Sequence, residues 1–369
     1  MGFSDIFSAI DKDHLKLSIY STTAADVQQA LQQPAGDLSA LMAMLSPAAE
    51  PFIEQMAQQA MHLTQKRFGH NISLFIPLYL SNLCANECDY CGFTMSNKIK
   101  RKVLNSKEIA AEIKIIKQRQ FDSVLLVSGE HETKVGIEYF KQVLPQVKQY
   151  FSHLAMEVQP LEVSEYQQLI ELGLDAVMLY QETYQAHTYA KHHTRGKKKD
   201  FNYRLNSPDR LGEARIDKMG LGVLLGLDDW RLDALMMGHH LHYLENKYWR
   251  SKYSISLPRL RPCTGGIQPA SPITDLGLVQ VICAFRLFSE QLEISLSTRE
   301  SNELRDNLIP LGITHMSAGS STQPGGYTAA TNELDQFEIS DERPVEVIAG
   351  MIANKGYQAV FKDWENGWH

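Results

Sequence analysis

The stretch that decides the fold is Leu74-Phe75-Ile76-Pro77-Leu78-Tyr79-Leu80, followed closely by Cys84-Ala85-Asn86-Glu87-Cys88-Asp89-Tyr90-Cys91. The first part is an apolar run of the length of a buried strand, and the second is a C-x3-C-x2-C loop. Three thiolates in one loop suit three irons of a [4Fe–4S] cluster, but a four-cysteine site needs a fourth thiolate, which this loop lacks. Cys84, Cys88 and Cys91 therefore predict a cluster with one iron open to a small-molecule ligand.

Other uses of clustered cysteines fit this chain less well. A zinc ribbon needs a second C-x2-C or a histidine pair at matching distance, and neither follows the loop. A disulfide framework is typical of small secreted domains, not of 369 residues with five cysteines. His192 and His193 have no acid or thiol placed to complete a metal shell. Three unrelated buried thiols are the remaining alternative, and we expect Cys263 and Cys283 to be packing residues.

The composition is that of an ordinary globular protein, with 44% hydrophobic and 21% charged residues. A net charge of -7 argues against a nucleic-acid platform. No apolar run approaches the ~20 residues of a membrane span, and the first residues do not read as a signal peptide. Together with reduced thiols and an oxygen-sensitive cluster, these features predict a cytoplasmic protein that binds neither membrane nor nucleic acid.

Short apolar runs alternate with amphipathic helical stretches after residue 70, and eight such units over about 250 residues predict an α/β fold, a (β/α)8 TIM-type barrel. We expect an N-terminal helical extension over 1–70, the barrel over 71–321, and a C-terminal extension over 322–369 that packs on the barrel as a helix-strand tail. The expected strands are Ser73–Leu80, Ser123–Val127, Leu154–Val158, Ala176–Leu179, Gly222–Leu227, Ser254–Leu257, Glu293–Ser297 and Ile313–Ser317. The expected helices of the barrel include Ser106–Gln118, Ser164–Leu172, Asp209–Met219 and Asn302–Leu311.

Polar residues follow several of these strands, at the end of a barrel where active sites are built. A glycine there lets the backbone approach a ligand, and an arginine suits a carboxylate through its planar fork. The run 195–199, Arg-Gly-Lys-Lys-Lys, is expected to be a solvated loop. The strand-end residues are Gly129 and Glu130 after the second strand, Glu157 and Gln159 after the third, Gln181 and Glu182 after the fourth, Arg299 after the seventh, and Ser317 after the eighth.

The cysteine loop, with Tyr90 just before its third cysteine, resembles the cluster loop of radical S-adenosylmethionine (SAM) enzymes. In that superfamily SAM chelates the open iron through its amino and carboxylate groups. The position of Gly129-Glu130 matches the motif that holds the methionine amino group. Arg204 corresponds by order to an arginine that contacts the SAM carboxylate in the biotin-synthase branch, although Arg195, Arg210 and Arg215 compete for that role.

Further segments resemble the aromatic-amino-acid lyases of this superfamily, and most of all its tyrosine lyases of thiazole biosynthesis. The sister lyase that matures [FeFe] hydrogenase has an additional C-terminal cysteine cluster, which this chain lacks after Cys283. A tryptophan lyase and a sulfur-inserting enzyme like biotin synthase stay open as alternatives. The matching segments are Gln181–Tyr184, Pro258–Gly266, Ser297–Glu300, Ser317–Ser320 and Gln323–Tyr327.

The resemblance implies a reaction. SAM would yield methionine and a 5'-deoxyadenosyl radical, and Cα–Cβ scission of L-tyrosine would give 2-iminoacetate and p-cresol. Arg299, assisted by Ser317, would hold the substrate carboxylate, while Gln181 and Glu182 would accept hydrogen bonds from ribose hydroxyls or from a substrate amine. The expected partners are thiazole synthase and an electron donor of the flavodoxin or ferredoxin type.

Overall fold

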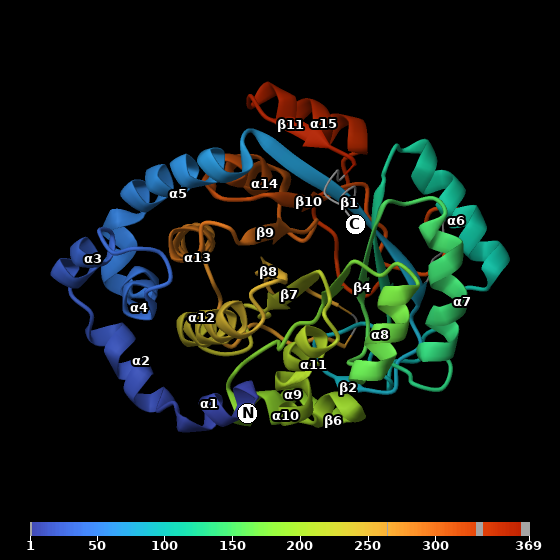
Figure 1. Cartoon of the computed structure of the whole chain (residues 1–369), viewed down its shortest axis with the longest axis horizontal. Helices are drawn as coiled ribbons and strands as arrows, with labels where there is room; N and C mark the ends of the chain where they lie inside the picture. Colours follow the sequence, from blue (N-terminus) through green and yellow to red (C-terminus); the bar gives the residue numbers. More distant parts are fainter. Residues whose placement is uncertain (1, 264, 330–334, 363–369) are drawn as a thin grey trace.

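A closed ring of eight parallel strands forms the centre of the computed structural model, which describes residues 2–263, 265–329 and 335–362. The ring order is β10-β9-β8-β7-β5-β4-β3-β1, and β10 pairs with β1 to close it (Figure 1). The predicted (β/α)8 barrel is therefore confirmed. The strands are β1 Asn71–Ser81, β3 Ser123–Ser128, β4 His153–Glu157, β5 Ala176–Met178, β7 Lys218–Gly222, β8 Lys252–Ser256, β9 Glu293–Leu296 and β10 His315–Ser317.

Strand β1 shows how the sequence builds the two faces of the barrel wall. Successive side chains of a strand point to opposite faces. Leu74, Ile76 and Leu78 are buried in the main hydrophobic core, whereas Pro77 and Tyr79 line a cavity inside the barrel. Near-continuous burial along β1 is what a parallel strand covered on both faces requires.

Helices surround the ring (Figure 1). The prediction for Ser106–Gln118 agrees with the observed α6, whose Asn105 N-cap accepts backbone hydrogen bonds and whose Ile109, Ile113 and Ile116 are buried. The outer helices are α6 Ser106–Gln118, α7 Ile137–Lys148, α8 Val163–Glu171, α9 Ala186–His192, α10 Phe201–Leu205, α11 Ser207–Glu213, α12 Trp230–Lys247, α13 Asp275–Phe288 and α14 Asn302–Leu308, with short 3-10 turns at Lys197–Lys199 and Ile309–Leu311.

The fifth strand and the helix before it differ from the prediction. The expected strand Gly222–Leu227 is β7 Lys218–Gly222, and the expected helix Asp209–Met219 is α11 Ser207–Glu213. Strand β7 opens on a buried lysine, which forms an ion pair with Glu293 of β9 at 2.8 Å. Beyond β7 only isolated bridges continue the pairing, at Val223 and Leu225, while Leu224 and Leu227 pack with Leu260 in a small separate cluster.

The first 70 residues fold as helices and share the barrel's core. Phe3 stacks on His240 of α12 at 3.9 Å between ring centroids. A Cβ on Gly238 of the same helix would lie 2.2 Å from Leu41, so the glycine allows the close approach of α4. The helices are α1 Phe3–Ala9, α2 Lys12–Ser21, α3 Ala24–Ala30, α4 Leu38–Leu45 and α5 Ile53–Phe68, with a 3-10 turn at Pro47–Phe52.

The C-terminal part crosses the mouth of the barrel and then returns to β1. Residues 335–341 bond to the barrel loops through Gly92 and Thr298. The helix α15 Val345–Asn354 and the strand β11 Gln358–Val360 follow, and β11 pairs in parallel with β1 (Figure 1). Parts of the expected extension over 322–369 lie outside the described residues. In the described part of the chain, no helix is long and apolar enough to cross a membrane.

Candidate active site

A cavity opens at the carboxyl ends of the strands, where loops of a barrel carry active sites. Residues from seven of the strands, and from the loop after β7, line it together with Gln336 and Phe337 of the C-terminal part. The structure brings nearly all of the predicted site residues to this one cavity. Those that line it are Cys84, Cys88, Tyr90, Cys91, Gly129, Glu130, Glu182, Arg204, Arg299 and Ser317.

The cysteine loop is held by contacts that the sequence did not reveal. The guanidinium of Arg101 donates to backbone carbonyls within and beside the loop, among them those of Asn82, Phe93 and Thr94. The short strand β2 Glu87–Cys88 pairs with β6 His193–Arg195 in an antiparallel ladder. The loop therefore has a fixed shape before any ligand binds.

The three thiols fit a cluster in which each sulfur binds a different iron. All three are free of disulfides and open onto the same cavity. Burial raises the pKa of Cys84 to about 11 and raises the pKa of Cys88 and Cys91 as well. These thiols keep their protons until a metal displaces them. Among the described residues, no group of three His, Cys, Asp or Glu side chains is placed to bind a single metal ion. A cluster does not require such a group, because each thiolate binds a different iron.

Glu130 and Arg204 meet at the edge of the cavity. The Arg204 guanidinium donates to Glu130 Oε1 at 3.0 Å and to the backbone oxygen of Tyr180, while Asn86 donates to Glu130 Oε2. A Cβ on Gly129 would lie 2.5 Å from the Leu83 carbonyl oxygen, so only glycine lets β3 approach the cysteine loop this closely. A partly buried carboxylate and a buried guanidinium are therefore placed where they could bind the two charges of a zwitterionic ligand.

Arg204, not its neighbours, lines the cavity. Arg195 is exposed. Arg210 donates to the Leu161 carbonyl oxygen and lies over the ring of Tyr203. Burial opposes the charge of Arg204, but Glu130, Tyr189 and Glu182 together outweigh it and raise the pKa of Arg204 above its ordinary value.

Lys198 corrects the expectation that the 195–199 run is a solvated loop. Its Nζ donates to Glu182 Oε1 at 2.7 Å, and both side chains are only 12% exposed. Glu182 itself has a positive φ of 70°, a conformation that costs energy and is found at functional sites. Burial opposes ionisation of Glu182, yet Lys198 and Arg204 outweigh it and hold its pKa below the usual range.

Tyr90 and Gln181 have different surroundings. The Tyr90 hydroxyl bonds His193 Nε2 at 2.6 Å. Burial, reinforced by Lys198, lowers the pKa of His193 to about 2, so this ring is neutral and serves as a hydrogen-bond partner rather than as a charge. Gln181 is buried behind the cavity, and its Nε2 has no hydrogen-bond partner among the described residues.

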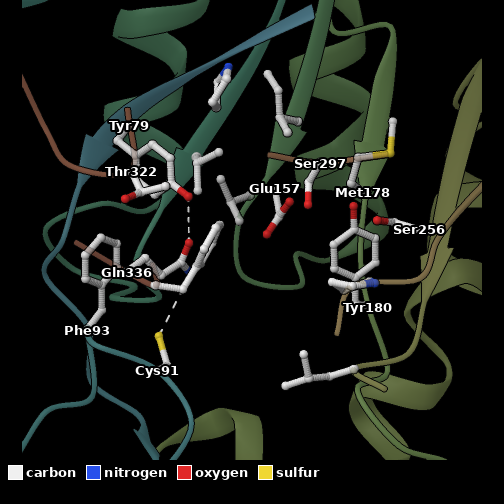
Figure 2. Close-up of a pocket in the computed structure, with 18 of the residues that line it drawn as sticks. Tyr79, Cys91, Phe93, Glu157, Met178, Tyr180, Ser256, Ser297, Thr322 and Gln336 are labelled. Atoms are coloured by element: carbon white, nitrogen blue, oxygen red, sulfur yellow. Dashed lines mark hydrogen bonds between the residues drawn. The ribbon is translucent and has the colours of Figure 1, made fainter. Parts of the chain in front are cut away.

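The far side of the cavity carries Arg299, Ser317 and Glu157. The Arg299 guanidinium lies 3.5 Å from the centroid of the Phe337 ring. Glu157 points into the cavity near Ser297 and Tyr180 (Figure 2). Burial raises the pKa of Glu157 to about 7, although Arg299 opposes the shift. The cavity therefore holds the Arg299 cation, which could bind the carboxylate of an α-amino acid, and the Glu157 carboxyl group, which could bind its amino group.

A barrel whose first loop presents three cysteines, with a glycine-glutamate pair after the next strand of the ring, defines a radical SAM enzyme. Residues 78–237 match the Radical SAM superfamily, and residues 256–358 match the Biotin and Thiamin Synthesis associated domain. The chain belongs to the 2-iminoacetate synthases, since it is 54% identical to 2-iminoacetate synthase of Escherichia coli K12 over 99% of this chain and 97% of that protein. It therefore carries a [4Fe–4S] cluster and uses SAM.

Other relatives agree with this placement. 2-Iminoacetate synthase of Salmonella typhimurium LT2 is 52% identical over 99% of this chain and 97% of that protein. The [FeFe]-hydrogenase maturase HydG of Carboxydothermus hydrogenoformans has the same fold, with a TM-score of 0.85 at 30% identity. That match covers 98% of this chain and 83% of the maturase.

Proposed function

We propose that this protein cleaves the Cα–Cβ bond of L-tyrosine to 2-iminoacetate and p-cresol, while SAM becomes methionine and 5'-deoxyadenosine. The product would supply the thiazole moiety of thiamine. One observation carries the proposal: the three cysteines and Arg299 open onto the same cavity. A radical source and a group that binds an amino-acid carboxylate thus share one enclosed space, as a reaction between them requires.

The cofactor side is assigned to the residues around the cysteine loop. Cys84, Cys88 and Cys91 would hold the cluster, and Glu130 and Arg204 would bind the amino and carboxylate groups of the methionine part of SAM. When bound, cluster and SAM supply the hydrogen-abstracting 5'-deoxyadenosyl radical. The remaining cofactor contacts are assigned to Tyr90 and Gly129, whereas the predicted contact of Gln181 is not retained because this side chain does not line the cavity.

The substrate side is assigned to the opposite wall. Arg299 would clamp the tyrosine carboxylate through two parallel hydrogen bonds, with the Ser317 hydroxyl as a further donor. Glu182, which lies between the two sides because it pairs with Lys198 and lies 3.9 Å from Arg204, would accept a hydrogen bond from the substrate amine. The barrel and the C-terminal part would shield the substrate from bulk water, which would protect a reactive intermediate from side reactions.

Two protein partners follow from the chemistry. The cluster needs one electron for each SAM that is cleaved, so a donor of the flavodoxin or ferredoxin type is expected. 2-Iminoacetate hydrolyses readily in water. We therefore propose that thiazole synthase binds this protein and consumes the product at the point of release.

Product analysis tests the proposed function. The reconstituted protein is incubated anaerobically with SAM, dithionite and either tyrosine or tryptophan, and p-cresol, 5'-deoxyadenosine and the hydrolysis product of the imine are quantified. Tyrosine should yield p-cresol and 5'-deoxyadenosine in step. An indole product from tryptophan alone would overturn the assignment. An additional [2Fe–2S] cluster found by iron counting would favour a sulfur-inserting enzyme instead.

A further inference from the structure

Gln336, in the segment that crosses the barrel mouth, lies between β1 and the third cysteine of the loop. Its Oε1 accepts a hydrogen bond from the Tyr79 hydroxyl at 2.7 Å, and its Nε2 donates to Cys91 Sγ at 3.9 Å (Figure 2). None of the roles assigned above involves this side chain. It is nevertheless a C-terminal residue in contact with a cluster ligand.

The backbone fixes Gln336 in this place from both sides. Its carbonyl oxygen accepts from Gly92 N at 3.0 Å, and its own N–H donates to the Thr322 carbonyl oxygen at 3.3 Å. A Cβ on Gly92 would lie 2.4 Å from the carbonyl oxygen of Asp335. The glycine after Cys91 thus makes room for the C-terminal segment, and the contact with the cysteine does not depend on one side chain alone.

Tyr79 determines which end of the Gln336 amide faces the sulfur. The Tyr79 hydroxyl is the donor of the 2.7 Å hydrogen bond to Oε1, so the amide oxygen is held at Tyr79. The amide NH2 group is then turned towards Cys91. A metal-bound thiolate can only accept a hydrogen bond, so its charge favours the same orientation.

We propose that Gln336 is a positioning residue that raises the reduction potential of the cluster by donating a hydrogen bond to the Cys91 thiolate, with Tyr79 holding the amide in place. Hydrogen bonds to cluster sulfurs and solvent exposure are among the factors that set such potentials. Reduction adds negative charge to the cluster and its sulfurs, so the donor stabilises the reduced state more than the oxidised one. This effect on the reduction potential requires only the cluster, and it does not depend on whether the substrate is tyrosine.

The test is a redox titration of the reconstituted full-length protein, followed by electron paramagnetic resonance without SAM or tyrosine. The variants are Gln336→Leu, which removes the donor; Gln336→Glu, which keeps the acceptor for Tyr79 but places a carboxylate near the sulfur; and Tyr79→Phe, which frees the amide. The matched control is Gln65→Leu, because Gln65 donates to the Tyr357 hydroxyl at 3.1 Å and neither residue lines the cavity. Iron content is measured first in every variant.

We expect all three variants to have more negative midpoint potentials than the wild type, with Gln336→Glu the lowest and Tyr79→Phe the least changed. For Gln336→Leu we expect up to about a tenfold loss in the equilibrium constant for one-electron reduction, which corresponds to about 59 mV. Gln65→Leu should keep the wild-type potential. If Gln336→Leu fails to assemble a cluster, the midpoint potential of Tyr79→Phe decides whether the proposal holds. Wild-type potentials in the variants that assemble, or an equal shift in Gln65→Leu, would overturn the proposal.

Discussion

The three cysteines of the loop are the residues whose roles are most sharply testable. Replacing Cys84, Cys88 or Cys91 by Ala should remove the brown chromophore and all SAM cleavage, because each thiolate is expected to hold one iron. Iron content and the visible spectrum after anaerobic reconstitution provide the measurement. Cys283→Ala, a change within the buried face of α13, should retain both. Loss of the chromophore in Cys263→Ala would contradict the assignment of a three-cysteine site.

Arg299 separates substrate binding from cofactor activation. Arg299→Leu should leave cluster content and SAM binding intact but abolish p-cresol formation, because the tyrosine carboxylate loses its bidentate partner. Arg299→Lys should restore activity only in part, since an ammonium cannot reproduce the planar fork. The assay compares 5'-deoxyadenosine and p-cresol in the same tube. Equal p-cresol yields from Arg299→Leu and wild type below saturating tyrosine would rule out the clamp.

Short-range patterns identified the cysteines and the strand-end residues, but not their partners. The spacing of the cysteines is local, so the sequence alone predicted the cluster ligands. Lys198 was misread because a run of basic residues is usually solvated. The β2–β6 ladder and a hydrogen bond from Lys198 N to Asn86 Oδ1 place its side chain at Glu182. Gln336 gave no signal at all, since its contact with Cys91 joins residues far apart in the chain.

Asp233 joins α12 to the loop after β5, and its burial predicts a dependence of stability on pH. Its Oδ1 accepts from Thr183 Oγ1 and from Tyr184 N. Burial raises the pKa of Asp233 from 3.8 to about 7. Between these values the folded state binds more protons than the unfolded chain, so the free energy of unfolding should fall as pH rises.

The variant Asp233→Asn tests this dependence, because its amide oxygen can keep both hydrogen bonds and has no proton to lose. Urea unfolding of the apoprotein is measured for both proteins from pH 4 to 7. Across that window the stability of the wild type should fall relative to Asp233→Asn by on the order of 1 kcal/mol per pH unit. Parallel stability profiles for the two proteins would contradict the shifted pKa.

Helices and strands with a regular spacing of apolar residues were predicted well. A strand whose position depends on an ion pair between residues far apart in the sequence was not. Helix α6 combines an N-cap with three isoleucines on one face, so its limits could be read from the sequence. Strand β7 could not, because it begins at Lys218, whose charge is compensated by Glu293 of β9, two strands later in the chain. The apolar residues that follow β7 match the pattern of a buried strand better than β7 itself does, and the prediction was therefore shifted towards them.

At the scale of the whole molecule, a buried ion pair fastens the C-terminal part to the barrel. Asp341 bonds Arg305 of α14 and accepts from Arg343 Nε at 2.8 Å, and the side chains of Asp341 and Arg305 have no exposed surface. Asp341→Ala leaves the Arg305 guanidinium buried without its carboxylate. We expect a loss of about 3–5 kcal/mol in the free energy of unfolding and faster hydrogen exchange over residues 335–341.

Glu338 offers the control for this prediction in the same segment. Its side chain is 54% exposed and lies 3.7 Å from Arg261, so Glu338→Ala should cost at most about 1 kcal/mol. Denaturant unfolding and hydrogen exchange are measured for both variants. A loss of stability in Asp341→Ala no larger than that in Glu338→Ala would show that the ion pair does not fasten the segment.

The overall architecture was predictable because eight alternating units of strand and helix admit few arrangements. The sequence also placed the helix-strand tail, which the structure confirms as α15 and β11. The path of residues 335–341 across the barrel mouth could not be foreseen. It has no periodic pattern, and its position rests on contacts with residues far away in the sequence, among them Gly92, Thr298 and Arg305.

That path has a consequence for how the protein is made. Chains emerge from the ribosome from the N-terminus and begin to fold during synthesis. The cysteine loop therefore exists long before Gln336, and β1 long before β11, which pairs with it. On the nascent chain the barrel mouth has no cover, so iron and sulfide have direct access to the thiols. In the finished protein Gln336 and Phe337 line the same cavity as the thiols, so delivery during translation is the less obstructed route.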